Sequence, residues 1–127
     1  MRVKVALSWA MVATGLLAGC AGGKKPEVSY SKDVRPILES RCLSCHTKPD
    51  GAGYKKSGLS MDSYQELMKG TQYGPVIKPG DPVSSTLVRL IEGKADPRIS
   101  MPHGGEPLTE QQITTIREWV AQGAKDN

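Results

Sequence analysis

The sequence is poor in aromatic residues. Its 127 residues include no phenylalanine, four tyrosines and two tryptophans. One of the two tryptophans lies within the first twenty residues, and the other is Trp119. Aromatic side chains bury large apolar areas, and a domain of roughly 100 residues has a high surface for its volume. The composition therefore predicts a weak core unless another apolar group completes it.

Neither sign of charge dominates. The formal net charge is +4, and if Arg2 and Lys4 are lost on processing, 15 basic side chains remain against 13 acidic ones. No basic stripe with interleaved aromatic residues occurs, so the sequence gives no indication of a nucleic-acid partner. The length predicts one domain rather than two.

A long hydrophobic run is also missing. Val5 to Leu17 is largely apolar, but it is shorter than the roughly 20 residues of a membrane-spanning helix. With Arg2 and Lys4 before it, this run is typical of an export signal over residues 1–19. It ends in Leu17-Ala18-Gly19-Cys20, which resembles the lipobox of bacterial lipoproteins. That resemblance implies cleavage before Cys20 and a lipid on its sulfur.

Lipidation of Cys20 predicts an exported protein anchored to a bacterial membrane on its periplasmic side, because several acyl chains give stable anchoring. Ala21 follows where a retention signal would have an aspartate, which favours the outer membrane over the inner one. The alternative is an ordinary secretory signal that leaves a free thiol. Residues 20–29 predict a flexible tether, and residues 30–127 a single domain.

The rest of the chain predicts an all-α fold of about four short helices. Apolar residues recur at helical spacing in four segments, 31–41, 62–69, 85–92 and 109–123. The last has the clearest signal, because Thr109 and Gln112 form a capping box and Gly123 ends the pattern. The Gly- and Pro-rich passage 74–82 predicts a loop.

The pattern with the most specific chemistry is Cys42-Leu43-Ser44-Cys45-His46, which has the C-x-x-C-H spacing of covalent c-type haem attachment. Two thiols three residues apart can reach the two vinyl groups of a haem, and the next side chain then lies beneath the iron. His46 is therefore the predicted proximal ligand, and one covalent haem c is the predicted cofactor. A buried porphyrin would also supply the apolar volume that the sequence lacks.

Three other interpretations of this cysteine pair are open. A zinc site needs about four ligands, and only His103 remains to complete a set with Cys42, Cys45 and His46. A thioredoxin-like redox pair needs a βαβ context, whereas this region predicts a helix. A structural disulfide between residues three apart would close a very small loop and constrain the chain little.

An electron carrier with six-coordinate iron needs a second axial ligand, and thioether sulfur suits that role. Met68 has the helical spacing of a core residue with Tyr64 and Leu67, and Met61 lies at a helix start, so both are interpreted as structural residues. Met101 lies in the loop before the last helix, where Pro102 and the glycines beyond it favour an extended backbone. Met101 is therefore the predicted distal ligand, with His103 as a nitrogen alternative.

Several of these motifs together resemble the planctomycete-type cytochrome c domain, over about Tyr30 to Ala124. The resemblance rests on Val34-Arg35-Pro36-Ile37-Leu38, Cys42-Leu43-Ser44-Cys45-His46, Pro79-Gly80-Asp81-Pro82, Met101-Pro102 and the last helix. It implies a cytochrome c-like helical bundle around one haem, with its first and last helices crossing beside it. Cys42 and Cys45 would be the thioether anchors, and His46 and Met101 the axial pair. The chain departs from the family at His103, where many members have a second proline.

The predicted function is that of a monohaem cytochrome that carries single electrons between a redox-protein donor and acceptor. It would not be an enzyme and would have no small-molecule substrate. One alternative is a peroxidase-like enzyme with an open iron face beside His103. The other is a haem-bearing sensor module.

Two weaker predictions concern the surroundings of the haem. The carbonyl group of Gly74-Pro75 would accept a hydrogen bond from the proximal imidazole, although an ordinary turn explains this step equally well. Lys48, Lys55 and Lys56 would form a positive rim that steers an acidic partner, although they are also typical of solvated loops.

Overall fold

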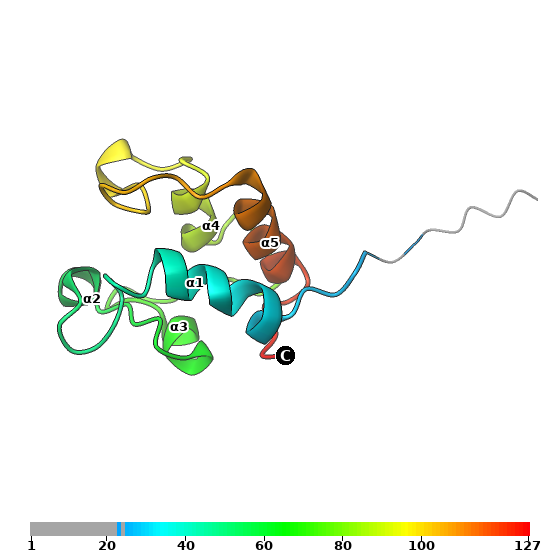
Figure 1. Ribbon diagram of the computed structural model, residues 1–127, viewed down its shortest axis with the longest axis horizontal. Coiled ribbons are helices and arrows are strands. Elements are labelled where there is room, and N and C mark those ends of the chain that lie inside the picture. Colours follow the sequence, from blue (N-terminus) through cyan, green and yellow to red (C-terminus); the bar gives the residue numbers. More distant parts are fainter. Residues whose placement is uncertain (1–22, 24) are drawn as a thin grey trace, which may run out of the picture.

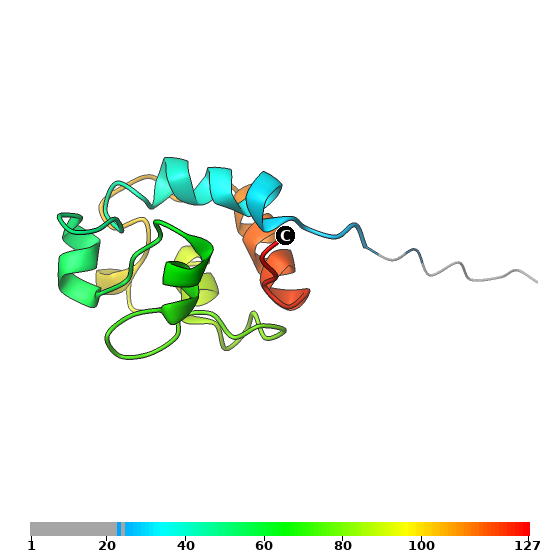
Figure 2. The ribbon, with the colours of Figure 1, turned by 90° about the horizontal axis from the view of Figure 1, so that it is seen from below.

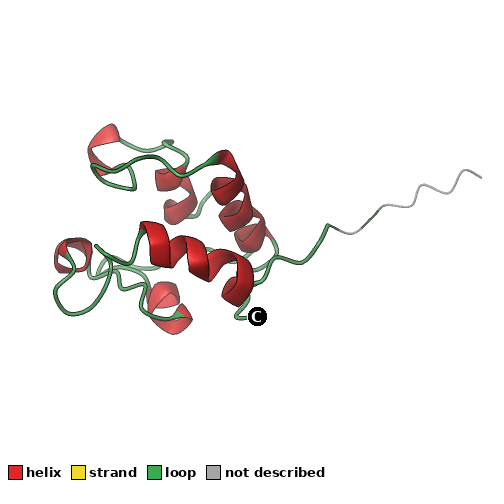
Figure 3. Cartoon of the chain, viewed as in Figure 1, coloured by secondary structure: helices red, strands yellow, loops and turns green. Residues whose placement is uncertain are grey.

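The computed structural model describes residues 23 and 25–127, so the predicted signal peptide and Cys20 lie outside the described residues. The helices follow in the order η1 (Tyr30–Val34), α1 (Arg35–Arg41), α2 (Ala52–Ser57), α3 (Tyr64–Lys69), α4 (Thr86–Ile91), η2 (Pro97–Ile99) and α5 (Glu110–Ala121). The described residues contain no β-strand (Figure 3). They also contain no helix long and apolar enough to cross a membrane. The all-α prediction is confirmed.

The first predicted helix is built from η1 and α1. In η1, the amide of Arg35 donates to the carbonyl of Tyr30, five residues back, so the turn is wider than an α-helical one. Pro36 follows directly and has no amide hydrogen, so it cannot donate to the carbonyl of Lys32. The chain continues from there as regular α-helix to Arg41.

Three further helices, α3, α4 and α5, lie within their predicted segments, and side chains cap the first and the last of them. Ser63 accepts a hydrogen bond from the Glu66 amide at the start of α3. At the start of α5, Thr109 and Gln112 form the predicted capping box, with bonds of 3.0 and 3.2 Å. Side-chain caps satisfy amides that the first helical turn leaves unpaired, which fixes where these two helices begin.

The helix α2 is not among the predicted elements, and it brings the number of α-helices in the described residues to five where about four were expected. It has no buried residue and no side-chain cap, and it ends at Gly58 in a left-handed conformation. No apolar periodicity marks it in the sequence. A backbone bond of 3.0 Å from the Tyr54 amide to the Cys45 carbonyl connects it to the cysteine motif.

Three of the five aromatic residues in the described part of the chain, Tyr30, Tyr64 and Trp119, form one cluster. The ring centroid of Tyr30 lies 5.2 Å from that of Tyr64 and 5.5 Å from that of Trp119. The Tyr64 hydroxyl and the Trp119 indole donate to the carbonyls of Ala124 and Lys125, at 2.8 and 2.9 Å. The cluster therefore joins η1, α3 and α5 to the C-terminal residues.

Both views of the ribbon place α2 and the loop around η2 at the end of the molecule far from the C-terminus (Figures 1 and 2). The opposite end holds α5 and the aromatic cluster. Part of the predicted tether runs along α5, where Lys25 pairs with Glu118 at 2.8 Å and the Val28 amide donates to the Gln122 side chain at 2.8 Å.

Candidate functional site

The cysteine motif forms a turn directly after α1. The amides of Cys45 and His46 both donate to the Cys42 carbonyl, at 3.1 and 3.0 Å. Cys42 is half-buried, Cys45 is exposed, and both are free thiols. One turn of chain thus holds two sulfur atoms and an imidazole, which is the donor set that the spacing predicts.

His46 is buried, with 7% of its surface exposed. Its Nδ1 atom lies 3.2 Å from the Leu59 carbonyl oxygen. Because a carbonyl only accepts, Nδ1 carries the proton, and Nε2 keeps the lone pair that binds a metal. This is the arrangement of a metal-binding histidine whose other nitrogen is held by a second group.

The Leu59 carbonyl is a partner of His46 that the sequence did not reveal. The sequence left the Gly74-Pro75 step open as either this acceptor or an ordinary turn, and the structure shows the turn. The Gly74 carbonyl instead accepts from the Thr71 amide at 2.9 Å and forms an ordinary turn. A backbone acceptor depends on how the loop folds and not on the side chain of its residue, so no sequence pattern marked Leu59.

Two glycines let the chain fold closely around His46. A Cβ atom on Gly53 would lie 2.7 Å from Cε1 and 2.9 Å from Nε2 of the imidazole. A Cβ atom on Gly51 would collide with the carbonyls of Cys45 and Thr47. The backbone at the start of α2 can therefore lie against the imidazole because these two positions have no side chain. The two glycines were the available sequence signal for this close approach.

The Cys42 thiol is not poised to act as a nucleophile. Burial raises its pKa to about 11, and the neighbouring Arg41 opposes that shift only in part. A thiol of this kind stays protonated at neutral pH, whereas redox-active cysteines have lowered pKa values. In the part of the chain that the structure describes, no three His, Cys, Asp or Glu side chains gather to hold a metal ion. The raised pKa of Cys42 weighs against the redox-pair interpretation.

The candidate distal ligands lie in different environments. Met61 is buried in the core, and Met68 packs against it. Met101 is half-buried in the loop after η2, packs against the same core, and donates its amide to the Leu90 carbonyl at 3.4 Å. His103 is exposed. Met101 is therefore the candidate that combines a loop position with partial burial.

Arg41 connects the loop of Met101 to the cysteine motif. Its guanidinium donates to the carbonyls of Glu106 and Pro107, the latter at 3.2 Å. An open hollow lies between the two segments, lined by Ser40, Arg41, Pro102, Gly105 and Glu106. Arg41 Nε is buried and has no hydrogen-bond partner among the described residues. A carboxylate, such as a haem propionate, would satisfy this donor.

A larger hollow lies elsewhere, between residues 25–28 and the exposed side of α5. It contains none of the predicted site residues. The predicted positive rim is largely paired, since Lys48 bonds to Glu66 and Lys55 lies 3.0 Å from Asp50.

The planctomycete cytochrome C family matches residues 42–104, from the first cysteine of the motif to the loop of Met101. The chain therefore carries a planctomycete cytochrome c domain. No curated protein and no solved structure matches the chain. The family match leaves α1 and α5 outside it, so the assignment rests on the central part of the cytochrome.

Membership of this family implies haem c as the cofactor and electron transfer as the activity. The residues present fit that group. Two free thiols lie three residues apart. The hydrogen bond to Leu59 is made by Nδ1 of the imidazole and leaves Nε2 available. Gly53, whose backbone lies close to Nε2, has no side chain that would collide with the ring. The chemistry of the cytochrome domain thus agrees with its local geometry.

Proposed function

We propose that this protein is a monohaem c-type cytochrome that carries single electrons between two redox proteins. The observation that carries the proposal is His46, which directly follows two free thiols and has its Nδ1 held by the Leu59 carbonyl at 3.2 Å. A buried imidazole with one fixed nitrogen is suited to bind a metal and unsuited to shuttle protons.

Cys42 and Cys45 would hold the haem through thioether bonds, and His46 and Met101 would be its axial ligands. When bound, haem supplies an iron that cycles between the ferrous and ferric states. The protein holds the imidazole between the Leu59 carbonyl and α2, and it keeps the Met101 loop attached to α1 through Arg41. If His46 and Met101 both bind the iron, it would have no open position for a substrate.

Substitution of Met101 tests the distal ligand. Met101→Ala should leave the haem attached, lower the reduction potential and allow carbon monoxide to bind the reduced protein, because a thioether ligand stabilises reduced iron. Met68→Ala is the control, since Met68 also packs against the core and its loss should change neither property. An unchanged potential and spectrum in Met101→Ala would show that another side chain is the ligand. Rapid carbon monoxide binding to the unaltered protein would instead favour an enzyme.

We also propose that the protein is exported and anchored by a lipid on Cys20, on the periplasmic side and in the outer membrane rather than the inner. The lipobox-like Leu17-Ala18-Gly19-Cys20 supports this. Cys20→Ser should move the cytochrome from the membrane to the soluble fraction, because the lipid attachment point is lost. Retention of the variant in washed membranes would contradict lipid anchoring.

A further inference from the structure

The segment 59–62 lies beside the residues that contain and follow His46. The Leu59 carbonyl faces His46 Nδ1 at 3.2 Å, and the Met61 amide donates to the His46 carbonyl at 2.7 Å. Two residues of one segment thus meet the side chain and the backbone of His46. The position of the imidazole depends on how firmly this segment is held.

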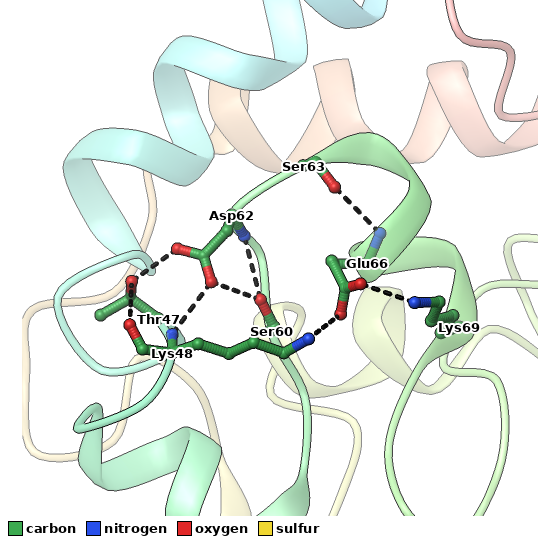
Figure 4. A network of polar contacts seen from close by, with 7 residues as sticks. All are labelled: Thr47, Lys48, Ser60, Asp62, Ser63, Glu66 and Lys69. Atoms are coloured by element: carbon green, nitrogen blue, oxygen red, sulfur yellow. Dashed lines mark hydrogen bonds and ion pairs between the residues drawn. The ribbon is translucent and has the colours of Figure 1, made fainter.

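Asp62 holds the two segments together through its side chain (Figure 4). One carboxylate oxygen accepts from the Thr47 hydroxyl. The other accepts from the Lys48 amide at 2.9 Å and from the Ser60 hydroxyl at 2.6 Å. Thr47 and Lys48 directly follow the histidine, and Ser60 directly follows Leu59. The Nδ1 hydrogen bond joins His46 to Leu59, and the Asp62 carboxylate binds the residues that directly follow each of them.

The surroundings keep this carboxylate ionised and in place. The Ser60 hydroxyl, followed by the Thr47 hydroxyl and the Lys48 amide, lowers the pKa of Asp62 to about 2. Ser60 is 1% exposed, so one of the three donors belongs to the interior. Arg35 of α1 donates to the Asp62 carbonyl at 2.8 Å. Asp62 thus connects α1, the chain after His46 and the segment that leads into α3.

We propose that Asp62 is the positioning residue of the proximal ligand, fixing the Leu59 carbonyl against His46 Nδ1 and thereby the orientation of the imidazole. This inference rests on the proposed function, because the orientation matters once His46 binds haem iron. Partners behind a metal-binding histidine set its orientation and its strength as a donor. Asp62 acts through Thr47, Lys48 and Ser60 and does not itself touch the imidazole.

The direct test is hydrogen exchange of the His46 Nδ1 proton, observed by NMR in the reduced, haem-loaded protein. We expect Asp62→Ala to speed this exchange about tenfold, because the Leu59 carbonyl is less firmly held. Thr47→Val should act in the same direction by a smaller factor, since it removes one donor and leaves the charge unchanged. The reduction potential should rise in both variants, because a less basic imidazole stabilises ferric iron less well.

Glu66→Gln is the matched control. Its carboxylate belongs to the same polar network but accepts from the Lys48 and Lys69 ammonium groups (Figure 4). This variant should leave the exchange rate unchanged, which separates the hydrogen bonds of Asp62 from the loss of a negative charge. Should Asp62→Ala fail to accumulate, Thr47→Val and Ser60→Ala test the same bonds one at a time.

The outcomes distinguish this inference from the proposed function. A chain that carries no haem would contradict the proposed function. A haem-loaded Asp62→Ala or Thr47→Val protein whose Nδ1 proton exchanges as slowly as in the unaltered protein would contradict the positioning role of Asp62 alone. Equal acceleration in Glu66→Gln would also contradict it, because charge and not hydrogen bonding would then be the cause.

Discussion

At the scale of single residues, the site depends on what Gly53 lacks. The imidazole of His46 is close enough to the Gly53 backbone that a methyl group would lie 2.7 Å from Cε1. Carbon atoms in folded proteins normally stay about 3.5–4.0 Å apart. Either the ring or α2 must move if this position carries a side chain.

Gly53→Ala should therefore destabilise the protein and lower the yield of attached haem. The cost of such overpacking is about 1–3 kcal/mol, which exceeds the small gain that alanine normally brings to a helix. Urea unfolding and the haem content of the purified protein measure the two effects. Gly105→Ala is the control, since its Cβ would meet Pro102 at an ordinary 3.4 Å. Equal stability of both variants would contradict the close approach to His46.

Asp62 gives the fold a defined acid dependence. Its hydrogen bonds with the Ser60 hydroxyl, the Thr47 hydroxyl and the Lys48 amide lower the pKa of Asp62 from 3.8 to about 2. Because the folded pKa is the lower one, the stabilisation is complete above about pH 4 and is lost as the pH falls toward 2. Asp62→Asn should be less stable than the unaltered protein at neutral pH, and the difference should shrink below pH 4. Urea unfolding at a series of pH values measures it, and a constant difference would contradict this origin.

At the scale of elements, the helices differ in how much of their structure is encoded locally. α5 carries a capping box and an apolar face that buries Ile116, Trp119 and Val120, so its position could be predicted from the sequence. α2 has no buried residue and is held by backbone contact with the cysteine turn. Its formation depends on tertiary structure, and for that reason it was not predicted. The π-helical turn before Pro36 likewise has no counterpart in apolar spacing.

Removal of the α5 cap tests the local part of this account. Thr109→Ala should lower the free energy of unfolding by about 1 kcal/mol, because it leaves the Gln112 amide without its side-chain acceptor. Thr114→Ala is the control, since Thr114 is exposed within the same helix and alanine favours helix there. A loss as large for Thr114 as for Thr109 would show that the capping box is not the cause.

At the scale of the whole molecule, the two ends are built by different means. The aromatic cluster of Tyr30, Tyr64 and Trp119 secures the end where residues 25–31 meet the C-terminal residues. The other end, with α2 and the loop around η2, relies on glycines and on the Asp62 hydrogen bonds (Figures 1 and 4). The shortage of aromatic residues could be read from the composition, whereas the clustering of these three away from the cysteine motif could not. A bound haem would add apolar surface at the end where these side chains are scarce.

The measurement that tests the central claim most directly is the intact mass of the mature protein from a host that attaches haem to exported cytochromes. The account predicts the mass of the polypeptide plus one tetrapyrrole, with attachment impaired in Cys42→Ala and Cys45→Ala. A folded protein from such a host whose mass shows no added tetrapyrrole would contradict the account.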